Sequence, residues 1–294
     1  MKRVLIIGGG AAGCMAAYSA AQSGGKVIVL EKMAALGRKM LIAGKGRCNV
    51  TNDCDTATFI KNMPGNGHFL YSALNTFSGN DLRACLEEWG VPTKTERGGR
   101  VFPVSDQAKD VVTAFEQALR RAKVEVQTGQ AVKEIQLKDG RVVGVITKQD
   151  QIISADAVIL ATGGASYPGT GSSGDGYRLA AAAGHTVTDL KPSLVPLEVA
   201  EEWVKDLQGL SLKNARATIY HDQQPVADDF GELLFTHYGL SGPIILSLSN
   251  KAAELLARPD SGEVILEINL KPALSVEQLD KRLQRDFSQF SRRQ

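Results

Sequence analysis

The sequence predicts an α/β fold in which a parallel sheet is followed by antiparallel β structure. Two short apolar runs, 3–7 and 26–30, flank an alanine-rich stretch of helical length, which is the order of a β-α-β unit. Short strand-like runs separated by turn residues then fill 124–161, and similar runs recur between 192 and 236. Glycine, with 30 of the 294 residues, falls in three clusters, at 8–13, 37–46 and 163–176.

The composition excludes several classes of protein. Apolar residues make up 43% and charged residues 22%, a balance that excludes disorder, collagen and coiled coil. No uncharged run approaches the roughly 18 residues of a membrane helix, and the first apolar stretch is too short for a secretory signal. With 34 basic and 32 acidic residues, the net charge of +2 gives no global field that favours nucleic acid or a membrane.

Cysteine usage indicates a reducing compartment. The four cysteines, Cys14, Cys48, Cys54 and Cys85, form no Cys-x-x-Cys pair and follow no secretory signal. We interpret them as reduced thiols of a cytoplasmic protein, with no disulfide framework and no zinc or other metal site.

The first glycine cluster lies where a dinucleotide-binding fold needs it. The strand at 3–7 leads into Gly-x-Gly-x-x-Gly, formed by Gly8, Gly10 and Gly13, and a helix follows. In this motif Gly8 allows a tight turn, Gly10 lets the backbone approach a pyrophosphate, and Gly13 lets the helix pack against the strand. The free N–H groups at the helix N-terminus then face the phosphates. The sequence therefore predicts a Rossmann-like nucleotide-binding domain.

The acidic residue at the end of the second predicted strand limits which dinucleotide can bind. Glu31 follows Gly13 by 18 residues, which is the expected place to accept a hydrogen bond from a ribose hydroxyl. A carboxylate there would repel a 2′-phosphate, which excludes NADP at this site. FAD and NAD both remain possible at this point.

The segment after Glu31 favours FAD. Residues 37–52 form a basic, glycine-rich stretch with little periodicity, which predicts a loop suited to a pyrophosphate and a polar ring edge. A solvated surface loop is the alternative interpretation. The donors in this stretch are Arg38, Lys39, Arg47, Asn49, Thr51 and Asn52.

Two amphipathic helices are predicted next. The first begins with Asn80 as its cap, ends before Gly90 and carries Leu82, Leu86 and Trp89 on one face. The second is recognised by an apolar stripe. That stripe comprises Val111, Val112, Phe115, Ala118, Leu119 and Ala122.

The runs between 124 and 161 predict an antiparallel meander. Their turn residues recur at the short spacing of consecutive hairpins. The last run, 157–161, is predicted to be a buried strand that leads into Thr162, Gly163 and Gly164 at the carboxyl edge of the sheet. This order is typical of FAD domains in two-electron flavoenzymes.

The third glycine cluster precedes a helix predicted at 176–183. Asp175 at its start has two interpretations, which the sequence does not separate. It is either an ordinary acidic residue of a first helical turn or a group that faces the cofactor or a substrate.

The C-terminal third predicts a β-rich subdomain followed by helices. Strand-like runs are expected at 194–199, 212–220 and 225–236, a loop at 235–243, and a helix that starts with Pro243. A further strand at 263–270 precedes a capping box, Ser275 to Gln278, which opens an amphipathic helix. The apolar side of that helix comprises Leu279, Leu283, Phe287 and Phe290.

Two side chains are candidate proton donors. His237 lies in the predicted loop, and a histidine with its ordinary pKa near 6.5 exchanges protons at neutral pH. A structural hydrogen bond is the alternative for His237. Cys48 lies in the basic glycine-rich segment beside the predicted flavin site, with a small packing residue as its alternative.

Five long motifs, in order along the chain, resemble one known family. They are GRKMLIAGKGRCNVTN, PGNGHFLYSALNTF, GRVFPVS, ATGGASYPGTGSSGDGY and GELLFTHYGLSGP. This set is similar to the BaiN-type flavoproteins, also labelled NAD(P)/FAD-dependent oxidoreductases or aminoacetone oxidase family FAD-binding enzymes. The resemblance implies a bacterial cytoplasmic flavoprotein built on the plan of fumarate-reductase-type enzymes, in which Ser173 replaces the threonine of a Thr-Gly-Asp-Gly turn.

The resemblance also implies a division of the chain. It places a FAD-binding domain at 1–190, an inserted β-rich subdomain at 191–270 and the start of a helical segment at 271–294. Family members continue beyond this point and return to the FAD domain, and nothing after Ser275 supplies that return segment. We therefore expect an intact ADP half of the site and an incomplete flavin half.

The resemblance assigns cofactor-binding residues position by position. The ADP half is assigned to the glycine motif and the end of the second strand, the pyrophosphate and flavin to residues 38–49, and the adenine contact to the backbone of Val132. The full set is Gly8, Gly10, Ala12, Gly13, Glu31, Lys32, Arg38, Lys39, Gly46, Arg47, Cys48, Asn49, Val132, Thr162, Gly163, Gly164 and Asp175.

The expected activity is NAD(P)H-driven hydride transfer through FAD to an activated C=C bond. The substrate class implied is a ring compound, either a steroid-like acid or a uracil base of ribosomal RNA, with His237 or Cys48 as the proton donor and Arg47 beside the reduced ring. Three alternatives stay open: an amine oxidase that uses O₂, an RNA-associated flavoprotein and an inactive fragment. Only the basic segment 271–294 supports RNA association, and a solvated helix face explains that segment as well.

Overall fold

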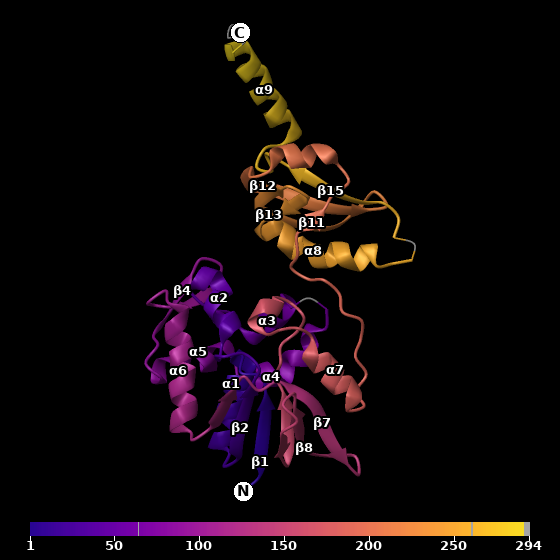
Figure 1. Cartoon of the computed structure of the whole chain (residues 1–294). Helices are drawn as coiled ribbons and strands as arrows, with labels where there is room; N and C mark the ends of the chain where they lie inside the picture. Colours follow the sequence, from indigo (N-terminus) through magenta and orange to yellow (C-terminus); the bar gives the residue numbers. More distant parts are fainter. Residues whose placement is uncertain (64, 260, 291–294) are drawn as a thin grey trace. The chain divides into compact units, whose positions relative to one another are not determined.

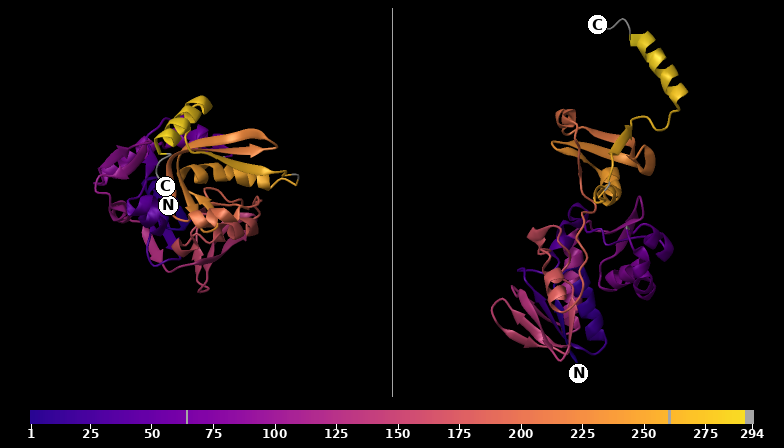
Figure 2. Two further views of the ribbon diagram at one scale, coloured as in Figure 1. Left: turned by 90° about the horizontal axis from the view of Figure 1, so that it is seen from above. Right: turned by 90° about the vertical axis from the view of Figure 1, so that its right-hand side faces the viewer.

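The computed structural model describes residues 1–63, 65–259 and 261–290 and divides the chain into two compact units, 1–188 and 189–294. Each unit is described by itself. The unit boundary lies two residues before the one predicted for the FAD-binding domain, and the assignment of domains within the second unit remains a prediction. Figures 1 and 2 show the order of the elements along each unit.

A four-stranded parallel sheet forms the centre of the first unit. Its order is β10-β1-β2-β6, and each neighbouring pair is parallel. The strands are β1 (Arg3–Ile7), β2 (Lys26–Glu31), β6 (Glu125–Thr128) and β10 (Ala157–Leu160), and helix α1 (Ala11–Gln22) connects β1 to β2. This arrangement confirms the predicted α/β, Rossmann-like fold.

Two predictions about these strands were wrong. Glu125–Thr128 was predicted as part of the meander but pairs in parallel with β2, because alternation along a short run does not reveal the direction of its partner. The run 157–161 was predicted to be buried, yet β10 is an edge strand that ends at Leu160 and leaves Ile159 37% exposed.

The predicted meander is present as a separate sheet. It contains β7 (Val132–Lys138), β8 (Arg141–Thr147) and β9 (Ile152–Ser154), and both pairings are antiparallel. Asp139 and Gly140 make the first turn with φ angles of 51° and 73°, which is the left-handed geometry that suits a two-residue hairpin.

Helices and a small sheet fill the long excursion between β2 and β6. The helices are α2 (Arg38–Gly46), α3 (Thr56–Lys61), η1 (Gly67–Leu70), α4 (Tyr71–Thr76), α5 (Gly79–Glu88) and α6 (Ala108–Arg121). The sheet has the antiparallel order β3-β5-β4, from β3 (Thr51–Asn52), β5 (Arg100–Pro103) and β4 (Thr93–Glu96).

Two further predictions in the segment between β2 and β6 were wrong, one about a loop and one about a helix cap. The segment 37–52 was predicted as a loop, but its first part is α2, which departs from helical geometry at Ala43, Gly44 and Lys45. Asn80 was predicted to cap α5, but Ser78 and Asp81 form the capping box, with reciprocal hydrogen bonds between side chain and backbone. Gly90 follows α5 with a φ of 88°, as expected for a residue beyond a helix end.

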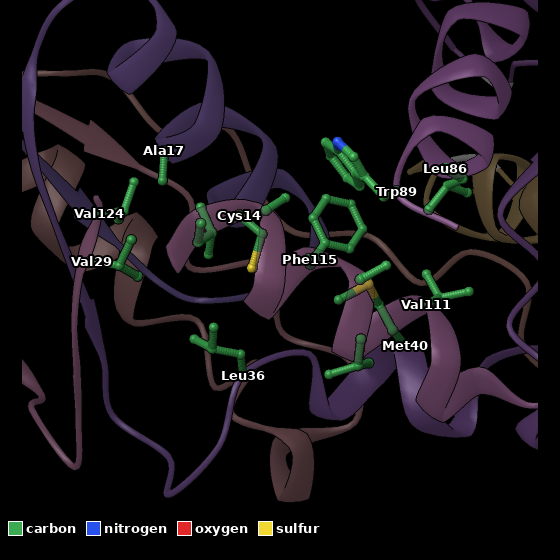
Figure 3. Packing of buried hydrophobic residues seen from close by; sticks show 14 of the residues in the cluster. Cys14, Ala17, Val29, Leu36, Met40, Leu86, Trp89, Val111, Phe115 and Val124 are labelled. Carbon is green, nitrogen blue, oxygen red and sulfur yellow. The ribbon is translucent and has the colours of Figure 1, made fainter. Parts of the chain in front are cut away.

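Two hydrophobic layers cover the faces of the parallel sheet. On one face, α1, α5 and α6 pack around Trp89, which lies beside Phe115 in Figure 3. The centroid of the Trp89 ring lies 5.0 Å from that of Tyr18 and 5.2 Å from that of Phe115. The predicted stripe on α6 lies in this layer. On the other face, Leu5 and Leu30 pack against the meander and against α7 (Asp175–Ala182).

The second unit is an antiparallel sheet packed against one helix. The sheet order is β11-β14-β13-β12-β15, and the helix is α8. The elements are β11 (Leu197–Glu198), η3 (Glu202–Leu207), β12 (Ser211–His221), β13 (Gln224–Thr236), β14 (Gly239–Ser241), α8 (Pro243–Leu256), β15 (Val264–Asn269) and α9 (Val276–Phe290).

The end of β13 departs from the prediction of a loop at 235–243. Strands β13 and β14 pair across a two-residue turn, with Thr236 opposite Gly239, so most of the predicted loop is a β-hairpin. Pro243 begins α8 as predicted, and the capping box between Ser275 and Gln278 is confirmed. The side chain of Phe290 and residues 291–294 lie outside the described part of the chain.

Candidate functional site

A cavity of about 820 Å³ opens at the carboxyl end of the parallel sheet. Doubly wound folds bind their ligands at this edge, and the volume lies within the roughly 300–1,000 Å³ typical of ligand sites. Its walls come from the β1–α1 turn, the segment between β10 and α7, the start of α2, residues 48–50 and apolar side chains of α5 and α6.

Two of the three motif glycines are tightly packed by protein atoms, and the third is not. A Cβ at Gly8, whose φ is 106°, would lie 2.4 Å from Ala161 O, and a Cβ at Gly13 would lie 1.8 Å from Gly8 O. A Cβ at Gly10 would meet no protein atom within 4 Å. Gly8 and Gly13 are thus required by the fold, whereas Gly10 leaves space on the cavity side, as a closely approaching pyrophosphate requires.

The start of α1 supplies hydrogen-bond donors to this space. Its N-cap, Gly10, has no side chain, and the first backbone bond of the helix runs from Cys14 N to Gly10 O at 2.9 Å. The preceding N–H groups, including that of Ala12, have no acceptor within the helix and favour an anion. The residues present therefore fit the ADP half of a dinucleotide.

Glu31 lies on the wall of the same cavity. Its Oε2 accepts a hydrogen bond from Gly9 N at 2.6 Å, and its Oε1 accepts one from Met33 N at 2.7 Å. These bonds fix the carboxylate and leave each oxygen with further capacity to accept a hydrogen bond, as a ribose hydroxyl requires.

Two lysines bind the segment between β10 and α7. Lys39 Nζ donates to Ser172 Oγ at 2.8 Å and to Ser166 O at 2.9 Å. Lys32 Nζ donates to Ser173 Oγ at 2.5 Å and to Asp175 Oδ2 at 2.6 Å. The hydrogen bond from Lys32 holds the pKa of the Asp175 carboxyl below its usual value. Asp175 is thus both an acidic first-turn residue of α7 and an ion-pair partner.

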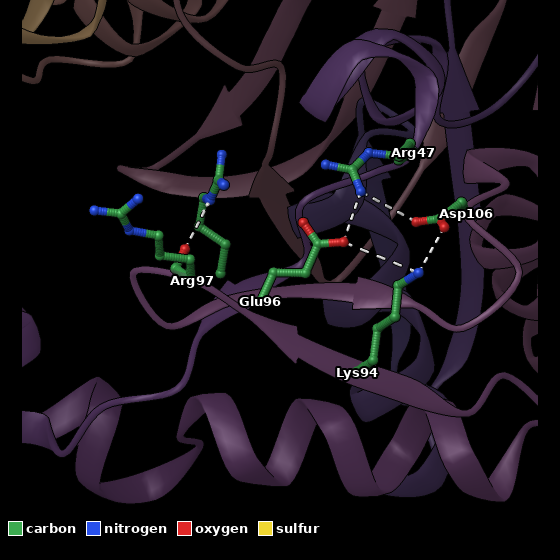
Figure 4. A network of polar contacts seen from close by, with 6 residues as sticks. Arg47, Lys94, Glu96, Arg97 and Asp106 are labelled. Carbon is green, nitrogen blue, oxygen red and sulfur yellow. Dashed lines mark hydrogen bonds and ion pairs between the residues drawn. The ribbon is translucent and has the colours of Figure 1, made fainter. Parts of the chain in front are cut away.

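Residues 46–49 divide between the cavity and the small sheet. Cys48 and Asn49 line the cavity, whereas Gly46 and Arg47 do not. The Arg47 guanidinium instead contacts Glu96 and Asp106 (Figure 4). The Cys48 side chain is buried, and this burial raises the pKa of its thiol to about 11.

The structure brings most of the predicted cofactor residues together. The main cavity is lined by Gly8, Gly10, Ala12, Glu31, Arg38, Lys39, Cys48, Asn49, Thr162 and Gly163. A narrow adjoining pocket is lined by Lys32, Val132 and Asp175, together with Glu31 and Thr162. Neither is lined by Gly13, Gly46, Arg47, Gly164 or His237.

His237 lies in the second unit, in the turn between β13 and β14. Its ring packs edge-to-face on Tyr238 with centroids 4.6 Å apart. This contact shows an aromatic partner for the imidazole, and the catalytic or substrate-binding role of His237 remains a prediction.

Sequence reasoning missed several cavity residues in the third glycine cluster and directly after it. Ser172, which is buried, and Tyr177 both line the cavity, and Gly176 would place a Cβ 2.1 Å from Thr162 Oγ1. The alternation of small residues before α7 was the available signal, because close packing at a helix start needs residues without bulk.

The parallel sheet, the glycine motif and the position of the cavity define a dinucleotide-binding flavoenzyme fold. The chain matches the model described as "HI0933-like protein Rossmann domain" over residues 2–269. The chain therefore belongs to the HI0933-like family of FAD-dependent oxidoreductases.

Two relatives illustrate the family. The chain is 35% identical over 285 residues to a 3-dehydro-bile acid delta(4,6)-reductase of Clostridium scindens, a match that covers 96% of this chain and 67% of the relative. It is 29% identical over 247 residues to a ribosomal RNA dihydrouridine synthase of Escherichia coli, covering 84% of this chain and 60% of the relative. The chain thus spans about two thirds of the length of these proteins.

A solved structure shows the same fold. The open conformation of a flavocytochrome c3 fumarate reductase superposes with a TM-score of 0.55 and 20% identity, over 72% of this chain and 47% of that one. No helix in the described ranges is both long and apolar enough to cross a membrane.

Proposed function

We propose that the first unit binds FAD in its main cavity, and that the protein transfers hydride from NAD(P)H to an activated C=C bond of a ring substrate. The observation that carries the proposal is the space beside Gly10, where a Cβ would meet no protein atom within 4 Å although Gly8 and Gly13 are tightly packed. Bound FAD would supply the capacity to accept and donate hydride.

The names of the two relatives support the class of reaction. One is a delta(4,6)-reductase of a bile acid and the other a dihydrouridine synthase, and both names describe the addition of hydrogen across a C=C bond. Because the chain spans about two thirds of these relatives, the activity is proposed for the protein as a whole.

The chain's own residues have separable tasks in this proposal. The N-terminus of α1 binds the pyrophosphate, and Glu31 binds the ribose. Cys48 is proposed as the proton donor because it lines the cavity and a cysteine thiol is protonated at neutral pH. His237 is proposed as the alternative donor.

The first test is an absorbance spectrum of the purified chain after addition of FAD and removal of free cofactor. Retained flavin bands are expected, and they should bleach under anaerobic conditions with NADH or NADPH and return with an electron-poor enone or uracil substrate. A chain that retains no flavin contradicts FAD binding. Rapid return of the bands with O₂ alone contradicts a reductase in favour of an oxidase.

The second test concerns the proton donor. Cys48→Ala should slow the return of the flavin bands with the C=C substrate and leave bleaching by NAD(P)H unchanged. Cys85→Ala is the matched control, because Cys85 lines neither cavity. Equal rates for both variants exclude Cys48 as the donor and leave His237.

A further inference from the structure

Arg47 occupies an ion network on the small antiparallel sheet. Its Nη1 lies 2.8 Å from Glu96 Oε1 and 3.2 Å from Asp106 Oδ1. Lys94 Nζ contacts the same two acids, at 2.5 Å from Asp106 and 3.9 Å from Glu96. Two cations and two anions therefore alternate, as Figure 4 shows.

The guanidinium also packs on an aromatic ring. Its Cζ lies 4.0 Å from the centroid of Phe102, a residue of β5 that is only 1% exposed. This distance is within the range of a cation–π contact. The Arg47 side chain is thus bound by two carboxylates and one buried ring, all of which belong to or follow the small sheet.

The backbone next to Arg47 is strained. Gly44, Lys45 and Cys48 have φ angles of 58°, 60° and 61°, and two of these residues carry side chains. A residue with a side chain in this region costs about 1–3 kcal/mol and persists only where its surroundings hold it. Two backbone bonds close the turn, from Cys48 N to Ala43 O at 2.9 Å and from Arg47 N to Gly44 O at 3.3 Å.

The strained turn carries part of the cavity wall. Cys48, Asn49 and Val50 line the cavity directly after Arg47. The Asn49 amide nitrogen, when turned toward the neighbouring carbonyls, donates to Thr51 O at 3.0 Å and to Val101 O at 3.1 Å. The wall is therefore attached to the small sheet on both sides of Cys48, by Arg47 before it and by Asn49 after it.

We propose that Arg47 is a positioning residue, which acts through Glu96 and Asp106 to hold the turn of residues 44–49 and thereby the Cys48 thiol in the cavity wall, and which does not itself bind the flavin. Each ion pair is about one third exposed, so neither contributes much to stability alone. Their shared effect is geometric, because a planar guanidinium whose Nη1 is bound by two carboxylates and whose face stacks on a ring has a fixed orientation.

This inference rests on the proposed function, because the turn forms part of the cavity proposed for FAD. The first measurement does not depend on FAD binding. Cys48 is 4% exposed, so opening of the turn should expose its thiol. The full chain without FAD is treated with iodoacetamide, and the rate of Cys48 alkylation is followed by peptide mass spectrometry. The variants are Arg47→Met, Arg47→Lys, the pair Glu96→Gln with Asp106→Asn, and the triple variant that combines this pair with Arg47→Met.

The expected result is a shared effect. Arg47→Met and the carboxylate pair should each raise the alkylation rate at least about fivefold, and the triple variant should react no faster than Arg47→Met, because both changes break one network. Arg47→Lys should restore part of the protection. Arg97→Met is the matched control and should react like the wild type, since Arg97 is an exposed arginine of the same hairpin outside the network.

The second measurement is the FAD dissociation constant. The proposal expects Arg47→Met and the carboxylate pair to weaken FAD binding by the same factor. A direct flavin contact instead predicts that only Arg47→Met weakens binding, with unchanged Cys48 alkylation, and this result overturns the proposal. The proposal is also overturned if the increase in Cys48 alkylation rate in the triple variant equals the product of the increases in Arg47→Met and in the carboxylate pair. If the wild-type chain binds no FAD, the proposed function fails while the alkylation result still decides the role of Arg47.

Discussion

Replacement of Gly10 by alanine should weaken ligand binding without damage to the fold. Gly10 has φ −76° and ψ −176°, an extended conformation that alanine adopts freely. Its Cβ would meet no protein atom within 4 Å. The new methyl group would therefore occupy only the space that a bound pyrophosphate requires.

The expected change in stability is small because two effects oppose each other. Alanine is a poorer N-cap than glycine, which costs roughly 0.5–1 kcal/mol. Loss of glycine's freedom in the unfolded chain stabilises by about 0.4–1 kcal/mol. The free energy of unfolding should therefore stay within about 0.5 kcal/mol of the wild-type value.

The expected change in affinity is larger. Insertion of a methyl group into a packed contact costs about 1–3 kcal/mol, which raises a dissociation constant about 5- to 150-fold. Gly13→Ala is the matched control, which should lower the stability of the fold. Its Cβ would lie 1.8 Å from Gly8 O, so the backbone must shift, and a loss of about 3 kcal/mol in the free energy of unfolding is expected.

Urea denaturation measures the free energy of unfolding of both variants, and quenching of flavin fluorescence measures the dissociation constant for FAD. The reasoning is refuted if Gly10→Ala binds FAD like the wild type, because the space beside Gly10 would then not be the pyrophosphate site. It is also refuted if Gly13→Ala is as stable as the wild type.

Two further predictions concern the walls of the cavity. Lys39→Met should accelerate amide hydrogen exchange in residues 165–174 about tenfold, because it removes the charged donor to Ser166 and Ser172, whereas the exposed Lys109→Met should not. The buried Cys48 thiol has a pKa raised from 9.0 to about 11. The unfolded chain therefore releases this proton first, and stability falls as the pH rises from 9 to 11. Urea denaturation should show a loss over that range about 2–3 kcal/mol greater for the wild type than for Cys48→Ala; equal losses would exclude the burial argument.

Local patterns were enough to predict the geometry of the half of the site that we propose for the nucleotide. Gly8, Gly10, Gly13 and Glu31 form one motif within 24 residues, and each position has a steric or hydrogen-bonding reason that depends on its own β-α-β unit. The sequence therefore contains the geometry of this half almost completely. The α/β class and the stripe on α6 were predictable for the same reason.

Features that depend on distant partners were not predictable. The resemblance assigned Arg47 to the pyrophosphate and flavin, and nothing in the sequence indicated its ion pairs with Glu96 and Asp106, which are 49 and 59 residues away. The parallel pairing of β6 depends on β2, from which it is separated by the whole helical excursion. Neither partner leaves a signal near the residue that it binds.

The basic residues that follow β2 differ in whether their side chains already bind other residues of the chain. Lys32, Lys39 and Arg47 all look like phosphate ligands in the sequence, yet each donates to oxygens of the chain itself. Arg38 lines the cavity, and within the described residues its side chain has neither an ion pair nor a hydrogen bond. A cation facing a cavity without a counter-charge gains most from an anionic ligand, since no existing contact must be broken. We therefore propose Arg38 as the side chain that binds the pyrophosphate, whereas Lys32, Lys39 and Arg47 bind other residues of this unit.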